Sequence, residues 1–126
     1  MNMILAIALG GGLGSVARHY AIALATHVWA AAFPYGTLLV NVLGSLIIGA
    51  LMETMALKWQ VSLETRAFLV TGFLGGFTTF SAFSFDVLKL VETNQYFSAL
   101  LYVFLSVALS LAAIFLAVHL IRGVLA

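Results

Sequence analysis

Four long apolar stretches separated by short polar interruptions set the pattern of this chain. They cover about residues 3–26, 34–57, 65–92 and 97–122. A helix needs about 20 residues to cross about 30 Å of hydrocarbon, and each stretch is longer than that. The second stretch opens at Pro34, the only proline, which suits a first helical turn. The pattern therefore predicts four transmembrane helices.

The connections between these stretches are short, which predicts one four-helix domain over residues 1–126. Consecutive helices joined by such loops should be antiparallel neighbours, with both termini on one side of the membrane. No basic residue precedes the first apolar stretch, so we expect a retained helix rather than a signal peptide.

Basic residues favour one end of the predicted bundle by only two or three. Lys58, Arg66 and Arg122 fall on the side of the termini, Lys89 on the other, and Arg18 inside the membrane towards Lys89. Membrane orientation follows the Lys/Arg imbalance of the loops, which is weak here. The pattern favours insertion in both orientations and hence an antiparallel homodimer, which would reproduce the inverted repeats of larger transporters.

The composition agrees with a membrane protein. The chain is 64% hydrophobic and 7% charged, against about 45–50% and about 25% in soluble domains. The net charge of +1 gives no electrostatic case for binding nucleic acid. With no cysteine, disulfides and zinc-thiolate sites are excluded.

The sequence "GGFTTFSAFSF" at residues 75–85 interrupts the third apolar stretch. It begins ten residues after Thr65, about 15 Å along a helix and close to the bilayer midplane. Glycines are poor helix residues, and the hydroxyls of paired threonines compete for backbone carbonyls. We expect a helix break at about 75–79.

A break exposes backbone carbonyls, which are costly in hydrocarbon and must face protein, water or a cation. In an antiparallel dimer the two breaks would meet on the symmetry axis. Their carbonyl oxygens would then surround one point suited to a hard monovalent cation. A tightly packed glycine-rich crossing without an ion is the alternative.

Aromatic and hydroxyl side chains alternate after the break. Phe80 and Phe83 share a helical face, and Ser81 and Ser84 form the adjoining stripe. The edge of a phenyl ring is positive, so ring edges flanked by hydroxyls can stabilise a partly dehydrated anion. Ordinary packing against protein or lipid is the competing interpretation of these rings.

Other spans carry polar groups at matching depth. Asn41 is followed by Gly44 and Ser45 on one face, and the fourth stretch has a polar residue at every fourth position: Ser98, Tyr102, Ser106 and Ser110. Such residues often serve only to join helices, but their constant spacing favours a conduit.

Arg18 is the only cation well inside a span. A residue of this kind faces the bundle interior or a water-filled cavity, so it indicates either an anion vestibule or pairing with backbone carbonyls. No acidic residue lies at mid-membrane, which argues against a proton-coupled carrier. The "GGGLG" of residues 10–14 is no nucleotide-binding motif, and nothing indicates an enzyme.

Three segments carry a resemblance to a known family: "GGGLGSVARHY", "GTLLVNVLGSLIIG" and "TGFLGGFTTFSAFSFDV". Over essentially its full length the chain resembles the Fluc fluoride channels, also called CrcB-like proteins. The resemblance implies passive, fluoride-selective export from the cytoplasm, which relieves fluoride toxicity, through a multi-pass protein of the cell (inner) membrane. It further implies a dual-topology antiparallel homodimer with two pores.

The resemblance also implies roles for individual residues. A structural sodium ion would be held by the backbone carbonyls of Gly75 and Thr78, and Arg18 would lie near an aqueous vestibule. The fluoride pathway would comprise Asn41, Thr79, Phe80, Ser81, Phe83, Tyr102, Ser106 and Ser110. Ala82 departs from a small hydroxyl residue common in the family. Without the resemblance, the residues indicate only an anion path with a central cation site. A coupled fluoride/proton or drug transporter and a non-transporting scaffold are the rival hypotheses.

Overall fold

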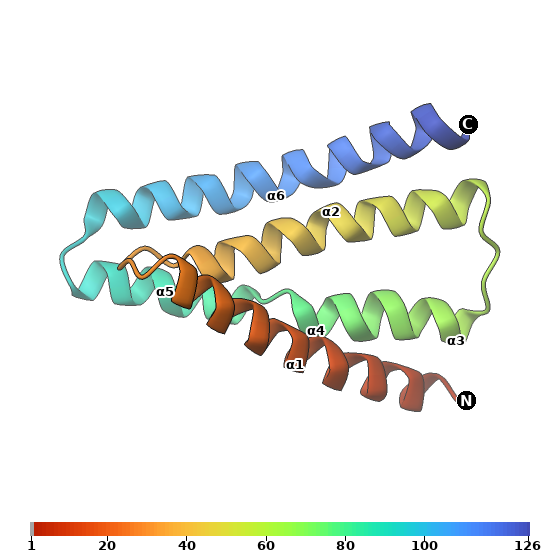
Figure 1. Cartoon of the computed structure of the whole chain (residues 1–126), viewed down its shortest axis with the longest axis horizontal. Coiled ribbons are helices and arrows are strands. Elements are labelled where there is room, and N and C mark those ends of the chain that lie inside the picture. The colour runs from red at the N-terminus through yellow and green to blue at the C-terminus, as the bar shows by residue number, and fades with distance from the viewer. Residues whose placement is uncertain (1) are drawn as a thin grey trace.

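The computed structural model describes residues 2–126, and the regular elements in this range are all helices. Its four long segments are α1 (Met3–Val28), α2 (Tyr35–Leu57), a composite segment from Leu63 to Glu92, and α6 (Tyr96–Leu125). They lie within three residues of the predicted bounds. Both termini lie at one end of the molecule, as expected (Figure 1).

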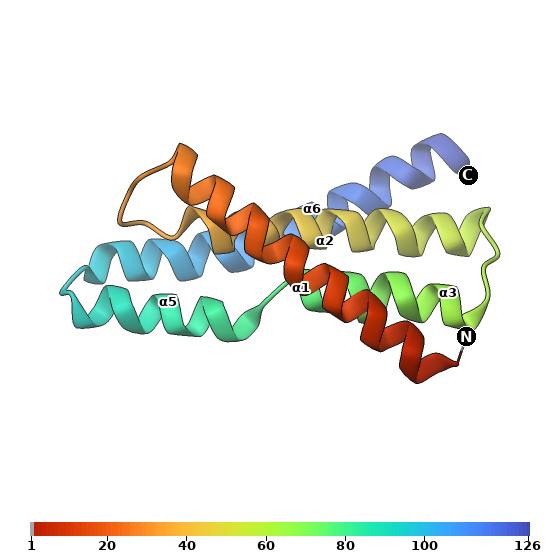
Figure 2. The ribbon, with the colours of Figure 1, turned by 60° about the horizontal axis from the view of Figure 1, so that its bottom comes forward.

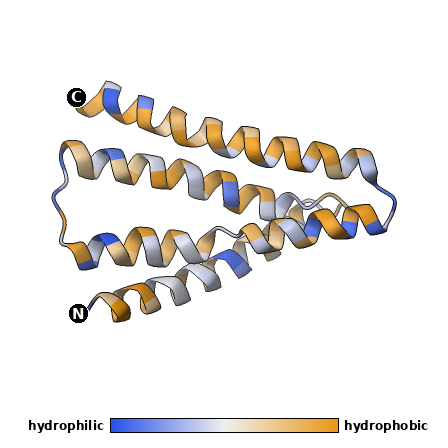
Figure 3. Ribbon diagram, turned by 180° about the vertical axis from the view of Figure 1, so that it is seen from behind, coloured by the Kyte–Doolittle hydropathy of each residue, from blue (hydrophilic) through white to orange (hydrophobic). Residues whose placement is uncertain are grey.

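Three of these segments are long and apolar enough to cross a membrane: Tyr35–Leu57, Leu63–Glu92 and Tyr96–Leu125. Apolar residues dominate along them, with hydrophilic ones at the connections and at a few positions within the spans (Figure 3). α1 has 26 residues, but its run of glycines and the Arg18-His19 pair dilute its apolar character. The structure thus supports a multi-pass membrane protein, while the crossing by α1 remains a prediction.

The third segment is broken, as predicted. It consists of α3 (Leu63–Arg66), the wider π-helical turns of η1 (Ala67–Leu74), α4 (Gly75–Phe77) and α5 (Phe80–Glu92). Between α4 and α5 the backbone is extended, with φ/ψ of −87°/156° at Thr78 and −152°/116° at Thr79. The extended link lies near the middle of the long axis (Figure 2). The π-helical turns of η1 were not expected.

The break falls on the two threonines and not on the glycines before them. Gly75 and Gly76 are both helical. The Thr78 hydroxyl donates to the carbonyl of Leu74 at 2.9 Å, and the Thr79 hydroxyl accepts from the N–H of Ala82 at 3.1 Å, which caps α5. The threonine side chains thus satisfy backbone groups at both edges of the break.

The glycines instead allow α1 to approach the third segment closely. α1 crosses this segment obliquely (Figure 2) and packs mainly on η1 and α4. A Cβ on Gly10 would overlap the carbonyl oxygen of Phe68, and a Cβ on Gly14 would overlap the carbonyl of Phe73. Only glycine permits this backbone contact, which buttresses the half of the segment before the break.

α2 packs mainly on α6, its neighbour in space but not in sequence. A Cβ on Gly49 would lie 2.8 Å from the carbonyl oxygen of Ile114, and Arg122 Nε pairs with Glu53 Oε1 at 2.8 Å. By contrast, α2 contacts the third segment at only a few positions. α2 therefore contacts the helices before and after it in sequence, but its main packing partner is α6, which Gly49 allows to approach closely.

Candidate functional site

A cavity of about 420 Å³ lies beside the break, between α2, the two halves of the third segment and α6. It gathers eight of the eleven residues that the sequence singled out: Asn41, Gly75, Thr78, Thr79, Phe80, Phe83, Ser106 and Ser110. Ser81, Tyr102 and Arg18 are not among the residues that line it. Tertiary folding thus brings together polar groups from three separate spans.

Asn41 holds the break in place through its side-chain amide. Its Oδ1 accepts from the N–H of Thr79 at 2.7 Å, and its Nδ2 donates to the Thr79 carbonyl at 3.0 Å. Both backbone groups of Thr79 would otherwise lack helical partners inside an apolar bundle, at a cost of several kcal/mol each. Since an asparagine amide has two N–H donors, one of them remains for another partner.

The same arrangement leaves the carbonyls of Gly75 and Thr78 without their usual helical hydrogen-bond donors. In an unbroken helix they would accept from the N–H groups of Thr79 and Ala82, four residues on. Those N–H groups donate instead to Asn41 Oδ1 and to Thr79 Oγ1. Two backbone oxygens are therefore free of these helical bonds, and backbone oxygen is a suitable ligand for a hard cation.

Ser106 supplies a buried hydroxyl without a partner. Its Oγ is the one buried side-chain polar atom within residues 2–126 that makes no hydrogen bond, and the residue is 8% exposed. Leaving such a group unpaired costs about 1–3 kcal/mol. Ser110 lines the same cavity one turn further along α6. The unpaired hydroxyl in a cavity indicates a place where a ligand accepts a hydrogen bond.

The two phenylalanines lie at different depths. Their ring centroids are 5.4 Å apart and the rings are tilted by 47°. Phe80 is 77% exposed, whereas Phe83 is half-buried. Ser81 is also exposed, with its Oγ 3.3 Å from the hydroxyl of Thr79. The Phe80 side of the cavity therefore opens outwards.

Tyr102 does not line this cavity but packs against Phe83, which does. It is fully buried, its ring centroid is 5.2 Å from that of Phe83, and its hydroxyl donates to Asp86 Oδ2 at 3.0 Å. From the sequence we predicted only that no acidic residue lies at mid-membrane, and Asp86 was given no role. The signal that could have drawn attention to Asp86 is its position directly after the alternating phenylalanines and serines of residues 80–85.

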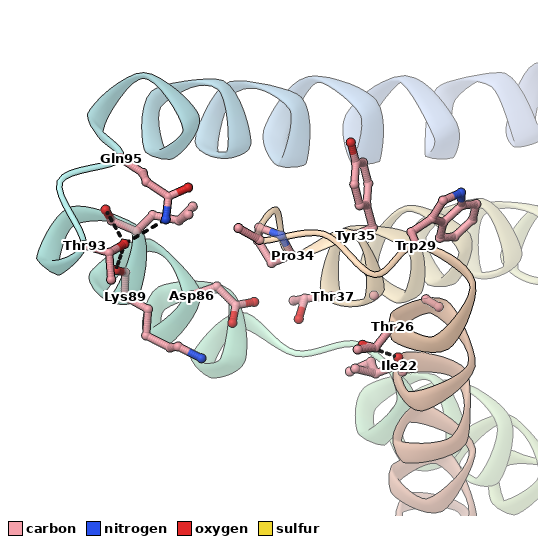
Figure 4. A pocket seen from close by; sticks show the side chains of 14 residues that line it. Ile22, Thr26, Trp29, Pro34, Tyr35, Thr37, Asp86, Lys89, Thr93 and Gln95 are labelled. Atoms are coloured by element: carbon pink, nitrogen blue, oxygen red, sulfur yellow. Dashed lines mark hydrogen bonds between the residues drawn. The ribbon is translucent and has the colours of Figure 1, made fainter.

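Asp86 in turn lines a second cavity of about 370 Å³, at the end of the bundle with the α1–α2 and α5–α6 connections (Figure 4). Thr26, Trp29, Thr37 and Lys89 are among its other lining residues. The buried Tyr102 thus lies between the two cavities, touching Phe83 of the first and Asp86 of the second.

Arg18 is half-exposed, on the part of α1 beyond the glycines. It lines neither of these two cavities. Within residues 2–126 the side-chain ion pair is the one between Glu53 and Arg122, so the structure does not pair Arg18 with an acid. A vestibule role for Arg18 stays a prediction.

Comparison with known proteins assigns the chain to a family. The family described as CrcB-like protein, Camphor Resistance (CrcB), matches residues 5–118. Three relatives named fluoride-specific ion channel FluC are similar over nearly their whole length. The Rhodospirillum centenum protein is 48% identical over 126 residues, covering 100% of both chains. The Granulibacter bethesdensis protein is 47% identical over 122 residues, which is 97% of this chain and 96% of the relative.

The Chelativorans protein is 46% identical over 125 residues, which is 99% of this chain and 100% of the relative. The printed names describe ion channels, in agreement with the expectation that the chain is not an enzyme. The match over residues 5–118 includes the break, Asn41 and the α6 serines. The chain therefore belongs to the CrcB-like family, whose curated members similar to it are fluoride channels.

Proposed function

We propose that this protein is a fluoride-selective channel that lets fluoride leave the cytoplasm down its gradient and so relieves fluoride toxicity. The relatives that share almost half of its residues carry that activity in their names. The observation that carries the proposal in this chain is the unpaired hydroxyl of Ser106, buried in a cavity beside a mid-segment break.

Fluoride is small and strongly hydrated, so a selective path must replace its water with several close donors. The hydroxyls of Ser106 and Ser110 and the free N–H of Asn41 supply hydrogen bonds in the first cavity. The positive edges of Phe80 and Phe83 add stabilisation without a fixed charge. A path of this kind binds the anion without holding it too tightly to leave.

The proposed path continues from this cavity past Phe83 to Tyr102. Thr79 and Ser81 contribute hydroxyls at the break, where their oxygens lie 3.3 Å apart. Ser81 is exposed like Phe80 but, unlike Phe80, does not line the cavity that contains Ser106. We assign Ser81 to the part of the path that a second chain would complete. Arg18, on α1, would add positive charge near an aqueous vestibule.

The open side of the cavity supports assembly with a second, inverted copy. Phe80 is 77% exposed next to the exposed serines Ser81 and Ser84, whose hydroxyls bond to Thr79 and to the Phe80 carbonyl and keep further lone pairs that lipid tails cannot bond. The excess of basic residues at one end is small, which permits both orientations. An antiparallel homodimer would cover this side and form two equivalent paths.

A structural sodium ion fits the released carbonyls of Gly75 and Thr78. Two oxygens from one chain are too few for a hard cation, but two inverted chains would contribute four at one point on the axis. When bound, sodium would supply a positive charge that makes an anion in the nearby neutral path less costly. The fit of this site therefore depends on the proposed dimer.

Fluoride efflux from proteoliposomes tests the proposal. Vesicles containing the purified protein and either potassium fluoride or potassium chloride are diluted into medium free of both anions with valinomycin, and a fluoride or chloride electrode records release. We expect fast fluoride release, negligible chloride release, and no change when a pH gradient is imposed. Equal chloride and fluoride rates would overturn selectivity. Dependence on the pH gradient would favour the coupled transporter, and the absence of flux would favour the scaffold.

A further inference from the structure

The second cavity contains a pair of opposite charges that the proposed pathway does not use. Asp86 and Lys89 both belong to α5, and both side chains face this cavity (Figure 4). They are three positions apart, so they share a helical face. Lys89 is the one basic residue among those that line the cavity. Its Nζ lies 5.8 Å from the ring centroid of Phe85, within the range of a weak cation–π contact.

The first and second cavities are linked through the buried side chain of Tyr102. Asp86 Oδ2 accepts the hydroxyl of Tyr102 at 3.0 Å, and the Tyr102 ring lies 5.2 Å from that of Phe83. If fluoride passes along this line, it meets a carboxylate where the path opens at the end of the bundle. An uncompensated carboxylate there would repel an incoming anion.

We propose that Lys89 offsets the charge of Asp86 and gathers fluoride at this mouth of the path. This inference rests on the proposed channel function. Lys89 acts as an electrostatic steering residue, since the exposed ammonium group raises the local anion concentration without a fixed binding geometry. Its effect depends on charge and is screened by salt, unlike that of a residue needed for packing.

A charge series at position 89 tests the proposal. Lys89→Arg, Lys89→Gln and Lys89→Glu channels are compared with the unmodified protein in proteoliposomes under the same fluoride gradient. Ionic strength is set to about 10 mM or raised with potassium isethionate to about 1 M, where the Debye length is about 30 Å or about 3 Å. Fluoride efflux is the readout, and elution in gel filtration checks folding.

We expect Lys89→Arg to retain the unmodified rate at both ionic strengths. At low salt Lys89→Gln should lower the rate about three-fold and Lys89→Glu about ten-fold, as expected for one or two unit charges about 6 Å away in water. At high salt the rates should converge. Lys58→Gln is the matched control, because Lys58 is an exposed lysine that lines neither cavity.

Two results would overturn the proposal. One is a set of rates that does not follow the charge at position 89, including equal loss in the Arg and Gln variants. The other is a Lys89→Gln deficit of the same size at both ionic strengths, which would indicate a structural role. A channel that passes no fluoride in its unmodified form would instead defeat the proposed function and this inference with it.

Discussion

Asn41 and Thr79 are 38 residues apart in sequence, yet the amide of the first makes two hydrogen bonds with the backbone of the second. The bonds measure 2.7 and 3.0 Å and satisfy both the N–H and the carbonyl of Thr79. A side chain from α2 thus takes the place of helical partners at the break. The conformation of the break and the shape of the adjacent cavity depend on this contact.

Replacing Asn41 with Asp should therefore damage both structure and flux. A carboxylate can still accept from the N–H of Thr79, but it cannot donate to the Thr79 carbonyl and would face it with a negative charge. We expect a loss of stability of about 1–3 kcal/mol and at least a ten-fold decrease in fluoride efflux. Thermal unfolding in detergent and electrode efflux measure the two effects.

Asn2→Asp is the matched control for this substitution. Asn2 caps α1 by accepting from the N–H of Leu5 at 2.8 Å, and aspartate caps helices equally well. Its stability and flux should equal those of the unmodified protein. If the Asn41→Asp protein showed the same fluoride efflux as the unmodified protein, the Asn41 amide would have no role in the path.

Ser106→Ala separates function from stability. The hydroxyl has no partner in the folded chain, so its removal should leave the unfolding temperature unchanged or slightly raised. Fluoride efflux should fall about ten-fold if that hydroxyl contributes about 1.4 kcal/mol to the barrier. Thr54→Val is the comparison, since the Thr54 hydroxyl already donates to the carbonyl of Ala50 at 2.7 Å. A Ser106→Ala channel as fast as the unmodified one would contradict the assignment.

Phe80→Ile should abolish most fluoride flux. Isoleucine keeps an apolar side chain of similar volume but lacks a ring edge with positive potential. Phe97→Ile is an unusually close control, because Phe80 and Phe97 are both 77% exposed. We expect at least a ten-fold decrease for Phe80→Ile and none for Phe97→Ile. An equal decrease in flux for both variants would mean that Phe80 is exposed to lipid and has no specific role in the fluoride path.

Gly14→Ala should destabilise the contact between α1 and the third segment. Its methyl group would overlap the Phe73 carbonyl, and such overpacking costs about 1–3 kcal/mol. At Gly12, by contrast, a Cβ meets nothing within 4 Å. Gly12→Ala should therefore stabilise the helix by about 0.5–1 kcal/mol. Unfolding temperatures of the two variants should move in opposite directions, and a shift in the same direction would contradict this packing.

Labelling can test the inverted dimer directly. A cysteine placed at Asn2 would be the only cysteine in the chain. With both orientations present, an impermeant maleimide should label about half of the protein from either face of the membrane. Labelling from a single face would rule out dual topology and, with it, the four-carbonyl sodium site.

The apolar pattern was enough to predict four long helices and their bounds, because each segment needs a minimum length of apolar residues to be stable in lipid. The break was predictable for a local reason, since the paired threonines at 78 and 79 compete for their own backbone. Its position on the threonines rather than on Gly75 and Gly76 was not, because those glycines remain helical against α1.

The partners of the polar side chains could not be predicted. Tyr102 and Asp86 meet across 16 residues, and Asn41 meets Thr79 across 38. Serine spacing along α6 placed Ser106 and Ser110 on one track, but the unpaired state of Ser106 depends on which neighbours fill its surroundings. Such contacts require helix rotation and crossing, which a one-dimensional pattern does not contain.

By itself, the sequence determined that this protein is helical, resides in a membrane and is interrupted in its third long segment, since apolar length and local backbone chemistry act over a few neighbouring residues. Only the tertiary structure decided which amide holds the interruption, which carbonyls it releases and which hydroxyl is left without a partner. Those outcomes depend on close helix crossings at glycines, where the positions of atoms on two separate helices decide which hydrogen bonds form.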